Sequence, residues 1–418
     1  MGMKSNLAVV RLGDICTTNQ NSYSSKDDWQ FVNYLDTGNI TANQIDAIQY
    51  IDIKTEKLPS RSKRKVNYNN IIYSTVRPNQ RHYGIIKEQP ENFLVSTGFT
   101  VIEANPDKVE ADFLYFLLSS DSITESLSAI AEQSTSAYPS IKPSDIENLE
   151  ISLPPLSEQK QIATILKSIE DKIALNQQIN KNLEEQAQAI FKACFVDFEP
   201  FGGEMPTDWR YYHLSEFLPV ITGKKNANVS ADKGTYPFFS CSQDIAWTDE
   251  YSFEGNAILV AGNGDFNVKF YNGKFEAYQR TYVLIPRNPI YTSWLYYAIK
   301  HSLDEITIAA RGSVIKFITK GNLEDFSFAA PINLNEMHMI QKFQSINEMI
   351  AENRNENRNL ASLRDALLPR LLSGEIDVSG IEVLPSALEE AVADSREQRN
   401  LHGPFDSAEE AVASMLEG

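Results

Sequence analysis

The chain has few of the residues that build cross-links, metal sites or membrane spans. Its 418 residues include three cysteines, which lie far apart and form no C-x-x-C pair, so neither a disulfide framework nor a thiolate zinc site is expected. The five histidines form no H-x-x-x-H ligand pair. No apolar run approaches the roughly 18 residues that a membrane span needs. These absences predict a protein of the reducing cytoplasm with no secretory signal and no membrane partner.

Positive charge is scarce as well. The 38 Lys and Arg residues against 56 Asp and Glu residues give a net charge of -18, the wrong sign for a protein that coats nucleic acid without sequence preference. Residues 381–418 supply -7 of this charge, and they have no counterpart elsewhere in the chain. We expect a loosely attached acidic tail whose role the sequence does not reveal.

Signatures of catalysis are missing or degenerate. The phosphate-binding pattern G-x-x-x-x-G-K-[ST] does not occur. Glu158, Gln159 and Lys160 imitate a nuclease signature, but they fall in the first turn of an expected helix. The segment from Asn288 to Tyr291 imitates the Asn-Pro-Pro-Tyr motif of adenine-N6 methyltransferases, but its third residue is wrong and it is typical of a turn. We expect no catalytic residue, metal ligand or cofactor in this chain. A DNA methyltransferase or nuclease with degenerate motifs is the alternative.

What the chain does contain is a long internal repeat. The segment 146–154 matches 323–331 in polarity, 177 positions later, and each copy reads as a turn, a strand and a proline stop. The opening turns at 11–15 and 213–217 match as well. Before each copy lie strand-like runs and an apolar helix, in the same order. These segments are 70–76, 99–102 and 112–118 in the first half and 256–260, 282–285 and 293–299 in the second.

A long helix is expected after each copy of the repeat. Ten positions from Ile162 to Cys194, apolar except for Asn176 and Asn180, alternate in spacings of 4 and 3, which is an unbroken heptad seam. The positions from Phe343 to Leu371 repeat the seam and its two asparagines. We expect the helices to pack antiparallel, with facing asparagines fixing their register. Two independent amphipathic helices are the alternative. The asparagines are Asn176, Asn180, Asn353 and Asn357.

The sequence thus predicts a mixed α/β (α+β) fold with a pseudo-twofold internal repeat. Two similar globular domains are separated by two long antiparallel helices that form a coiled-coil-like spacer. The expected boundaries are 1–153 for the first globular domain, 154–198 for the first helix, 199–330 for the second domain, 331–378 for the second helix and 379–418 for the acidic tail.

Two segments are basic despite the overall charge. Residues 61–87 hold seven cations and no acid, interleaved with amide, imidazole and phenol groups that can bind base edges or the phosphate backbone. Residues 269–320 hold eight cations against three acids. The loops 133–138 and 311–313 precede the repeated strand at matching points. The candidate nucleic-acid contacts are Lys63, Arg64, Lys65, Arg77, Asn79, Gln80, Arg81, His82, Tyr83, Ser134, Thr135 and Tyr138 in the first domain, and Lys269, Gln279, Arg280, Arg311, Ser313 and Lys316 in the second.

Three segments resemble one protein family. Residues 153–163 read Leu-Pro-Pro-Leu-Ser-Glu-Gln-Lys-Gln-Ile-Ala and resemble the conserved spacer region of type I restriction-modification specificity subunits. The strand and turn at 71–78 and the closing segment 367–376 are similar to that family too. The resemblance covers about residues 7 to 378. The second copy of the proline-leucine-glutamine motif, at 331–336, departs from the pattern.

The resemblance implies a noncatalytic subunit that recognises double-stranded DNA. Similar proteins carry two target recognition domains, each reading one half of a split, asymmetric site, while antiparallel helices set the gap. The helices dock two methyltransferase (M) subunits, which supply S-adenosylmethionine and adenine-N6 chemistry. Restriction (R) subunits, which use ATP and Mg²⁺, can join. The charge of -18 then indicates little affinity for arbitrary DNA. A third hypothesis is a coiled-coil scaffold without sequence-dependent DNA binding.

Overall fold

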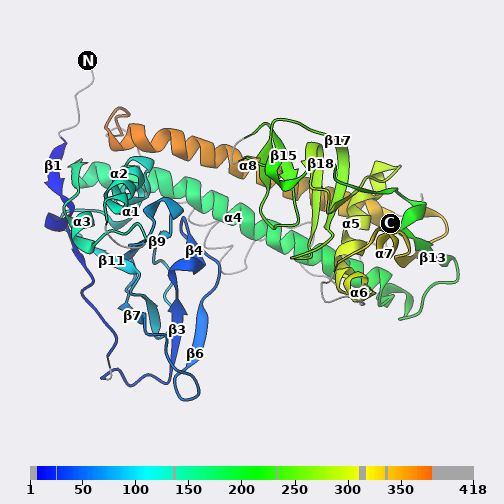
Figure 1. Cartoon of the computed structure of the whole chain (residues 1–418), viewed down its shortest axis with the longest axis horizontal. Coiled ribbons are helices and arrows are strands. Elements are labelled where there is room, and N and C mark those ends of the chain that lie inside the picture. Colours follow the sequence, from blue (N-terminus) through cyan, green and yellow to red (C-terminus); the bar gives the residue numbers. More distant parts are fainter. Residues whose placement is uncertain are drawn as a thin grey trace. The chain divides into compact units, whose positions relative to one another are not determined.

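The chain folds into two compact units (Figure 1). The computed structural model describes residues 7–24, 26–134, 138–231, 234–309, 317–334 and 338–378, so the acidic tail lies outside the described residues. Of the described residues, the first unit holds those up to Ala174 and those from Asn357 to Val378, and the second holds those from Leu175 to Glu356. Each unit therefore holds one globular domain and one section of each of two long helices, α4 (Leu156–Phe195) and α8 (His338–Leu372).

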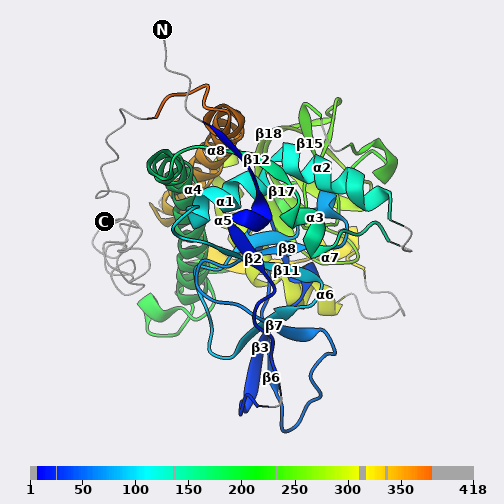
Figure 2. The same cartoon turned by 90° about the vertical axis from the view of Figure 1, so that its left-hand side faces the viewer.

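The first unit is built on two four-stranded sheets of order β2-β11-β8-β9 and β6-β3-β10-β7 (Figure 2). Two further strand pairs, β1-β12 and β4-β5, complete it. Its strands are β1 (Ala8–Arg11), β2 (Cys16–Thr18), β3 (Phe31–Leu35), β4 (Ile40–Thr41), β5 (Gln44–Ile45), β6 (Gln49–Asp52), β7 (Ser62–Lys65), β8 (Ile71–Ser74), β9 (Tyr83–Ile85), β10 (Phe93–Ser96), β11 (Phe99–Ala104) and β12 (Glu150–Leu153). Its short helices are α1 (Ala111–Ser119), α2 (Asp121–Glu132) and α3 (Pro143–Glu147).

The burial of strand β8 explains why residues 71–73 form a continuous apolar run in the sequence. Successive side chains of a strand point to opposite faces. Ile71 and Tyr73 belong to the core that contains α1 and the start of α4, whereas Ile72 belongs to a second core with Phe93 and Phe99. Because both faces of β8 are buried, the strand is almost entirely apolar, and its one small polar residue, Ser74, is buried with it. The sequence predictions for this strand, for β11 and for α1 are confirmed.

The second unit has a single six-stranded sheet of order β14-β19-β17-β18-β15-β16 and a separate pair, β13-β20. Helix α5 is buried from Thr292 to Ile299, which explains its apolar sequence. The predicted strand, strand and helix are confirmed here as well. The strands are β13 (Trp209–His213), β14 (Val220–Thr222), β15 (Tyr236–Phe239), β16 (Ala246–Thr248), β17 (Phe253–Ala261), β18 (Val268–Ala277), β19 (Thr281–Leu284) and β20 (Ser327–Pro331). The short helices are α5 (Thr292–His301), α6 (Leu303–Ala309) and α7 (Lys320–Glu324).

The predicted repeat is visible in how each domain closes. In the first unit, β1 pairs antiparallel with β12, and Leu12 N donates to Leu149 O at 3.0 Å. In the second, β13 pairs antiparallel with β20, and Leu214 N donates to Phe326 O at 2.9 Å. The first and last strands of each domain are thus neighbours, and the last strand leads toward a long helix.

The sections of α4 and α8 pair antiparallel within each unit, as the heptad seams predict. In the second unit, Leu183 and Ile190 of α4 share a core with Phe343 and Ile350 of α8. The corresponding core of the first unit joins Ile162 and Leu166 to Leu371. The two helices are therefore partners rather than independent amphipathic helices.

The four seam asparagines find three different partners. Asn353 Nδ2 donates to Asn180 Oδ1 at 2.9 Å, so these two face each other. Asn176 instead donates to the Glu356 carboxylate at 2.6 Å, and Asn357 donates to the carbonyl oxygen of Ile173 at 3.2 Å. Asn176 and Asn357 thus bind a carboxylate and a backbone carbonyl of the facing helix. Control of the helix register by these residues stays a prediction.

The first unit carries an ion pair where the second has an apolar contact. Arg364 Nη1 lies 3.3 Å from Glu170 Oε1, whereas the seam position that matches Arg364 in the repeat is the fully buried Ala187. Burial raises the pKa of the Glu170 carboxyl to about 7, although Arg364 acts in the opposite direction. The cost of burying this carboxylate thus exceeds the benefit of its partner.

The raised pKa of Glu170 predicts a loss of stability as pH rises. Between about pH 4.5 and 7 the unfolded chain has released the Glu170 proton while the folded chain keeps it, so the free energy of unfolding falls across this window, by on the order of 3 kcal/mol. Glu170→Gln should flatten that part of the pH profile in urea unfolding of the chain. Glu185→Gln, an exposed change on the same helix, should leave the profile unchanged. Equal profiles for Glu170→Gln and the unmodified chain would contradict the assignment.

Candidate nucleic-acid interface

In the first domain the structure brings together two segments that the sequence predicted separately. Val76 and Ser140 form an antiparallel bridge, and Arg77 N donates to Pro139 O at 3.0 Å. The Arg77 guanidinium lies over the Tyr138 ring, with its Cζ 5.3 Å from the ring centroid. We call residues 75–81 together with 138–141 the first corner.

A short, rigid turn forms the exposed edge of the first corner. Residues Pro78–Gln80 make one turn of 3-10 helix, and Pro78 restricts φ at its start. Asn79 and Gln80 are exposed. The residues on both sides, Arg77 and Arg81, adopt left-handed backbone conformations with φ of 48° and 57°. The turn therefore presents amide side chains from a backbone that has little freedom to move.

Three neighbouring candidate residues, by contrast, already interact with other groups of the protein. Arg81 pairs with Asp121 at 2.6 Å. His82 is half-buried, and its Nδ1 lies 2.6 Å from the carbonyl oxygen of Ile40. Tyr83 is 3% exposed and its hydroxyl donates to Ser119 O. Burial of the phenol disfavours a direct contact between Tyr83 and an external ligand, and its predicted role is not tested.

The cluster Lys63 to Lys65 lies on β7, in the other sheet of the domain. Lys63 is exposed, and none of the described carboxylates lies within ion-pair distance of it. Arg64 is half-buried, with a buried Nε that has no acceptor in the described part of the chain. Lys65 pairs with Asp27 and lies 5.2 Å from the Trp29 ring. Only Lys63 of the three is fully available to a ligand.

The second domain contains an equivalent corner, formed by residues 262–264, 279–281 and 317–318. An antiparallel bridge joins Asn263 to Phe317, as Val76 is joined to Ser140 in the first domain. Two further backbone hydrogen bonds match one for one. They are Gly262 N to Arg280 O (2.9 Å) and Ile318 N to Gly262 O (2.8 Å) in the second domain, and Thr75 N to Gly98 O (2.8 Å) and Ile141 N to Thr75 O (2.9 Å) in the first.

The predicted contacts of the second domain fall partly in this second corner. Gln279 and Arg280 are exposed there. Lys269, by contrast, is half-buried, and its ammonium donates to Ser242 O and Asn267 Oδ1, both at 2.6 Å. Burial lowers the pKa of Lys269. Lys269 therefore joins Ser242 to Asn267, and its contact with nucleic acid stays a prediction that this geometry does not favour.

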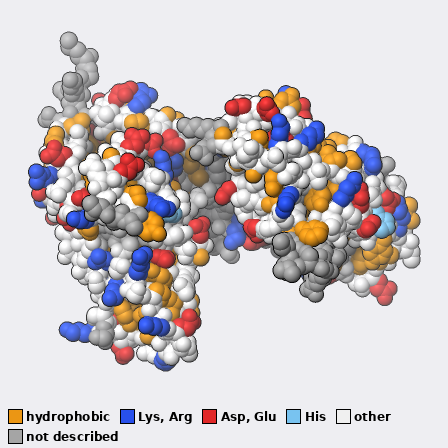
Figure 3. Space-filling view, viewed as in Figure 1, with side chains coloured by type: hydrophobic (Ala, Val, Ile, Leu, Met, Phe, Trp, Pro, Cys, Tyr) orange, Lys and Arg blue, Asp and Glu red, His pale blue; other side chains and the backbone are white. Residues whose placement is uncertain are grey.

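Of the remaining candidate residues, the structure describes one at the first corner and leaves four undescribed. Ser134 is half-buried with its hydroxyl 3.3 Å from Ser140 Oγ, at the first corner. Thr135, Arg311, Ser313 and Lys316 lie outside the described residues. On the face shown in Figure 3, basic side chains are dispersed among acidic and apolar ones on each unit. This face carries no continuous basic surface.

Sequence reasoning missed two groups of residues. Lys224 and Lys225 adjoin the second corner, because Gln279 N donates to Lys225 O; they precede the basic window at 269–320, and the signal for them was the Gly-Lys-Lys turn after β14. Gln159, set aside as part of a false nuclease signature, is 1% exposed. Its amide accepts from Glu110 N and donates to Pro154 O, both at 2.9 Å. Gln159 therefore fastens the start of α4 to the first domain.

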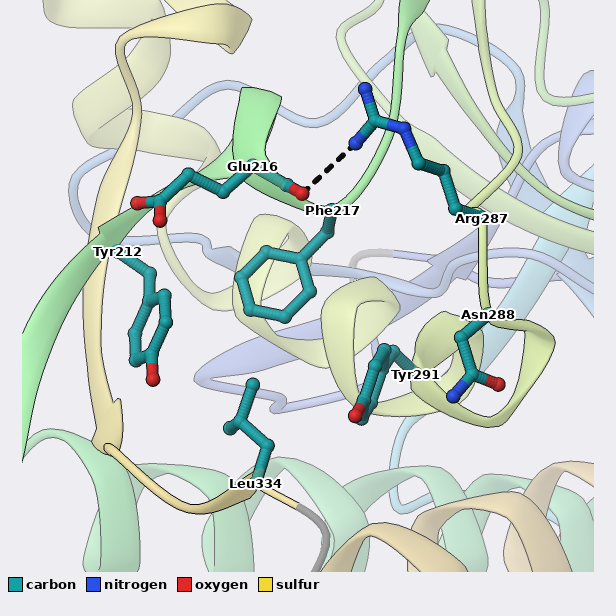
Figure 4. A pocket seen from close by; sticks show the side chains of 7 residues that line it. All are labelled: Tyr212, Glu216, Phe217, Arg287, Asn288, Tyr291 and Leu334. Carbon is teal, nitrogen blue, oxygen red and sulfur yellow. Dashed lines mark hydrogen bonds between the residues drawn. The ribbon is translucent and has the colours of Figure 1, made fainter.

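The methyltransferase-like segment lines a small pocket of the second unit (Figure 4). The pocket, of about 240 Å³, lies among Tyr212, Glu216, Phe217, Arg287, Asn288, Tyr291 and Leu334. The Asn288 side chain accepts from Ile290 N at 3.2 Å, capping the turn Pro289–Tyr291. Arg287 donates to Glu216 O at 2.9 Å. The polar groups around the pocket thus serve the local backbone, which supports the interpretation of this motif as a turn.

The described ranges contain neither a metal-binding cluster nor a membrane-spanning helix. No group of three or more His, Cys, Asp or Glu side chains there is arranged to hold a metal ion. No helix there is long and apolar enough to cross a membrane.

Comparisons with known proteins give a consistent result. Residues 4–185 and 206–359 match the family described as the type I restriction modification DNA specificity domain. Over 178 residues the chain is 34% identical to the type I restriction enzyme EcoDI specificity subunit of Escherichia coli, covering 42% of this chain and 40% of that protein. Over 208 residues it is 35% identical to the HindI specificity subunit of Haemophilus influenzae, covering 49% and 45%. The chain thus spans less than half the length of these two relatives.

The fold is similar to that of a solved specificity subunit. The crystal structure of the type I restriction-modification system S subunit from M. genitalium matches with a TM-score of 0.57, at 15% sequence identity. The match covers 89% of this chain and 97% of that one.

The two lysines of β7 provide a matched pair for testing the interface. If Lys63 contacts a phosphate, Lys63→Gln should reduce the slope of log affinity against log salt concentration for duplex DNA by about 0.9. Lys65→Gln should change the slope less, because Asp27 already neutralises Lys65. The slopes would be measured by titrating the chain against duplex DNA at several salt concentrations. An unchanged slope for Lys63→Gln would remove this residue from the interface.

Proposed function

Since this chain belongs to the type I restriction-modification DNA specificity family, we propose that it is the DNA-recognition subunit of such a system. Each globular domain reads one half of a bipartite, asymmetric site in double-stranded DNA. The family match covers both halves of the chain, which agrees with two readers in one polypeptide. Such a subunit works in the cytoplasm, where the DNA of the host is found, and three free cysteines fit that compartment.

The observation that carries the proposal is the pair of equivalent corners. Three backbone contacts recur in both domains, yet the side chains on this common frame differ. At the matched positions, Arg77 of the first domain corresponds to Gly264 of the second, and Gly98 corresponds to Arg280. Base edges are distinguished by the donors and acceptors that face them. Two frames with different side chains would therefore read two different half-sites.

The proposed role of α4 and α8 is to fix the gap between the half-sites. Within each unit their sections are held together by apolar cores. The Asn180 and Asn353 pair supports one register, because a polar contact in an apolar seam is lost if the helices slide.

Catalysis is assigned to partner subunits. We propose that the helices dock two methyltransferase subunits, which hold S-adenosylmethionine, and that restriction subunits using ATP and Mg²⁺ can join. The degenerate methyltransferase motif of this chain is disfavoured as a catalytic site because Asn288 caps its own turn. A pure scaffold is disfavoured because it gives no reason for two elaborate domains with matching exposed corners.

The direct test is to express the chain with the methyltransferase subunits and to map methylated adenines in host DNA. We expect one asymmetric motif with two specified halves separated by unspecified bases, and no methylation without this chain. Methylation by the purified chain alone would favour the enzyme alternative. Methylation without sequence preference in the full complex would favour the scaffold.

Shortening the helices tests their role separately. Removing one heptad from α4 and the facing heptad from α8 shortens each by about 10 Å. The preferred gap should then contract by up to about three base pairs, while both half-sites keep their sequences. Removing a heptad from α4 alone should instead destroy the seam and the activity. An unchanged gap after the paired deletion would show that the helices do not set it.

A further inference from the structure

Arg77 holds a backbone conformation that its side chain does not favour. Its φ is 48°, in the left-handed region where a residue with a Cβ is strained and where glycine is not. Asn, Asp and Gly tolerate this region best, and arginine has no such advantage. Strained residues of this kind are concentrated at functional sites. The question is why an arginine occupies this position.

The repeat supplies the comparison. Arg77 directly follows the bridge residue Val76, and Gly264 directly follows the equivalent bridge residue Asn263. Gly264 has a φ of 73°, so both copies of the corner need left-handed backbone at the same point. The second domain uses the residue that adopts this conformation freely. The first domain keeps an arginine there despite the strain, which points to a use for its side chain.

The Arg77 guanidinium is accessible to an external ligand, and a neighbouring ring restricts its orientation. Its side chain is exposed, and no carboxylate in the described part of the chain lies within ion-pair distance of it. The neighbouring Arg81 shares the left-handed backbone but is paired with Asp121. The Tyr138 ring beneath Arg77 favours one orientation of the guanidinium plane. Arg77 thus presents a planar pair of donors at the edge of the first corner.

We propose that Arg77 is the specificity-determining residue of the first domain and that it reads a guanine. A guanidinium offers two parallel N–H donors, which match the O6 and N7 acceptors of guanine in the major groove. The Tyr138 ring reduces the freedom that Arg77 would lose on binding. This inference rests on the proposed function and deepens it by naming one residue and one base.

The test separates folding from recognition. Arg77→Gly removes the side chain and relieves the backbone, so the urea midpoint of unfolding should stay equal or rise. In the complex with methyltransferase subunits, discrimination at one half-site should fall about 5- to 150-fold, as expected for a bidentate base contact. The other half-site should be unaffected. Asn92→Gly is the matched control, because Asn92 also has left-handed backbone in this domain; it should leave recognition unchanged.

The base is identified with modified DNA. Replacing each guanine of the affected half-site in turn by 7-deazaguanine removes the N7 acceptor. One such replacement should weaken binding by the unmodified protein and should have no further effect on Arg77→Gly, because the same contact is already missing. A half-site without guanine, or additive effects at every guanine, would overturn the proposal.

A phosphate contact gives a different result. Arg77→Gly would then weaken binding to all sequences equally and reduce the salt slope, which would also overturn the assignment to guanine. If the complex methylates a bipartite site but Arg77→Gly recognises both halves normally, only this inference fails. If the complex shows no sequence preference at all, the proposed function fails with it.

Discussion

The antiparallel pairing of the first and last strand of each domain is the constraint on which the rest of the structure depends. Because β1 pairs with β12 and β13 pairs with β20, each domain begins and ends at the same place. Because its two ends lie side by side, a domain closed in this way can be joined to a long helix at one point of its surface. In the first unit Gln159 strengthens that point by joining the first turn of α4 to Pro154 and Glu110. The chain can then alternate domain and helix twice.

The helix seam combines apolar and polar contacts with different consequences. Leu183 and Phe343 contribute burial, which stabilises any register that keeps apolar residues in the seam. The Asn180 and Asn353 pair has one correct register, because a displaced amide would be left without its partner. The Glu170 and Arg364 pair adds little net stability, since burial already raises the Glu170 pKa to about 7. We therefore expect polar groups in this seam to contribute more to specificity of pairing than to its strength.

The fold is predicted from the sequence far better than the availability of the charged groups at the candidate interface. Heptad spacing and the repeat are local or periodic patterns, so strands such as β8 and the helices follow from them directly. The net charge of the surface around residues 61–87 does not follow from the sequence, because acidic residues from outside this segment pair with its cations. Burial of Tyr83 was likewise hidden, since its neighbours come from α1 and β8. The neutralising pairs are Lys65 with Asp27, Arg81 with Asp121 and Lys87 with Asp112.

The two corners show how the side chains on a duplicated backbone frame diverge without refolding. Their backbone hydrogen bonds are equivalent, so a change of side chain on this frame leaves the frame intact. A Cβ at Gly264 would meet no atom within 4 Å, so space does not require glycine there; only its left-handed backbone favours it. A side chain at this position therefore carries a conformational cost but no steric one. Under the proposed function, recognition can therefore change at a single residue of either corner while the backbone hydrogen bonds of the frame are kept.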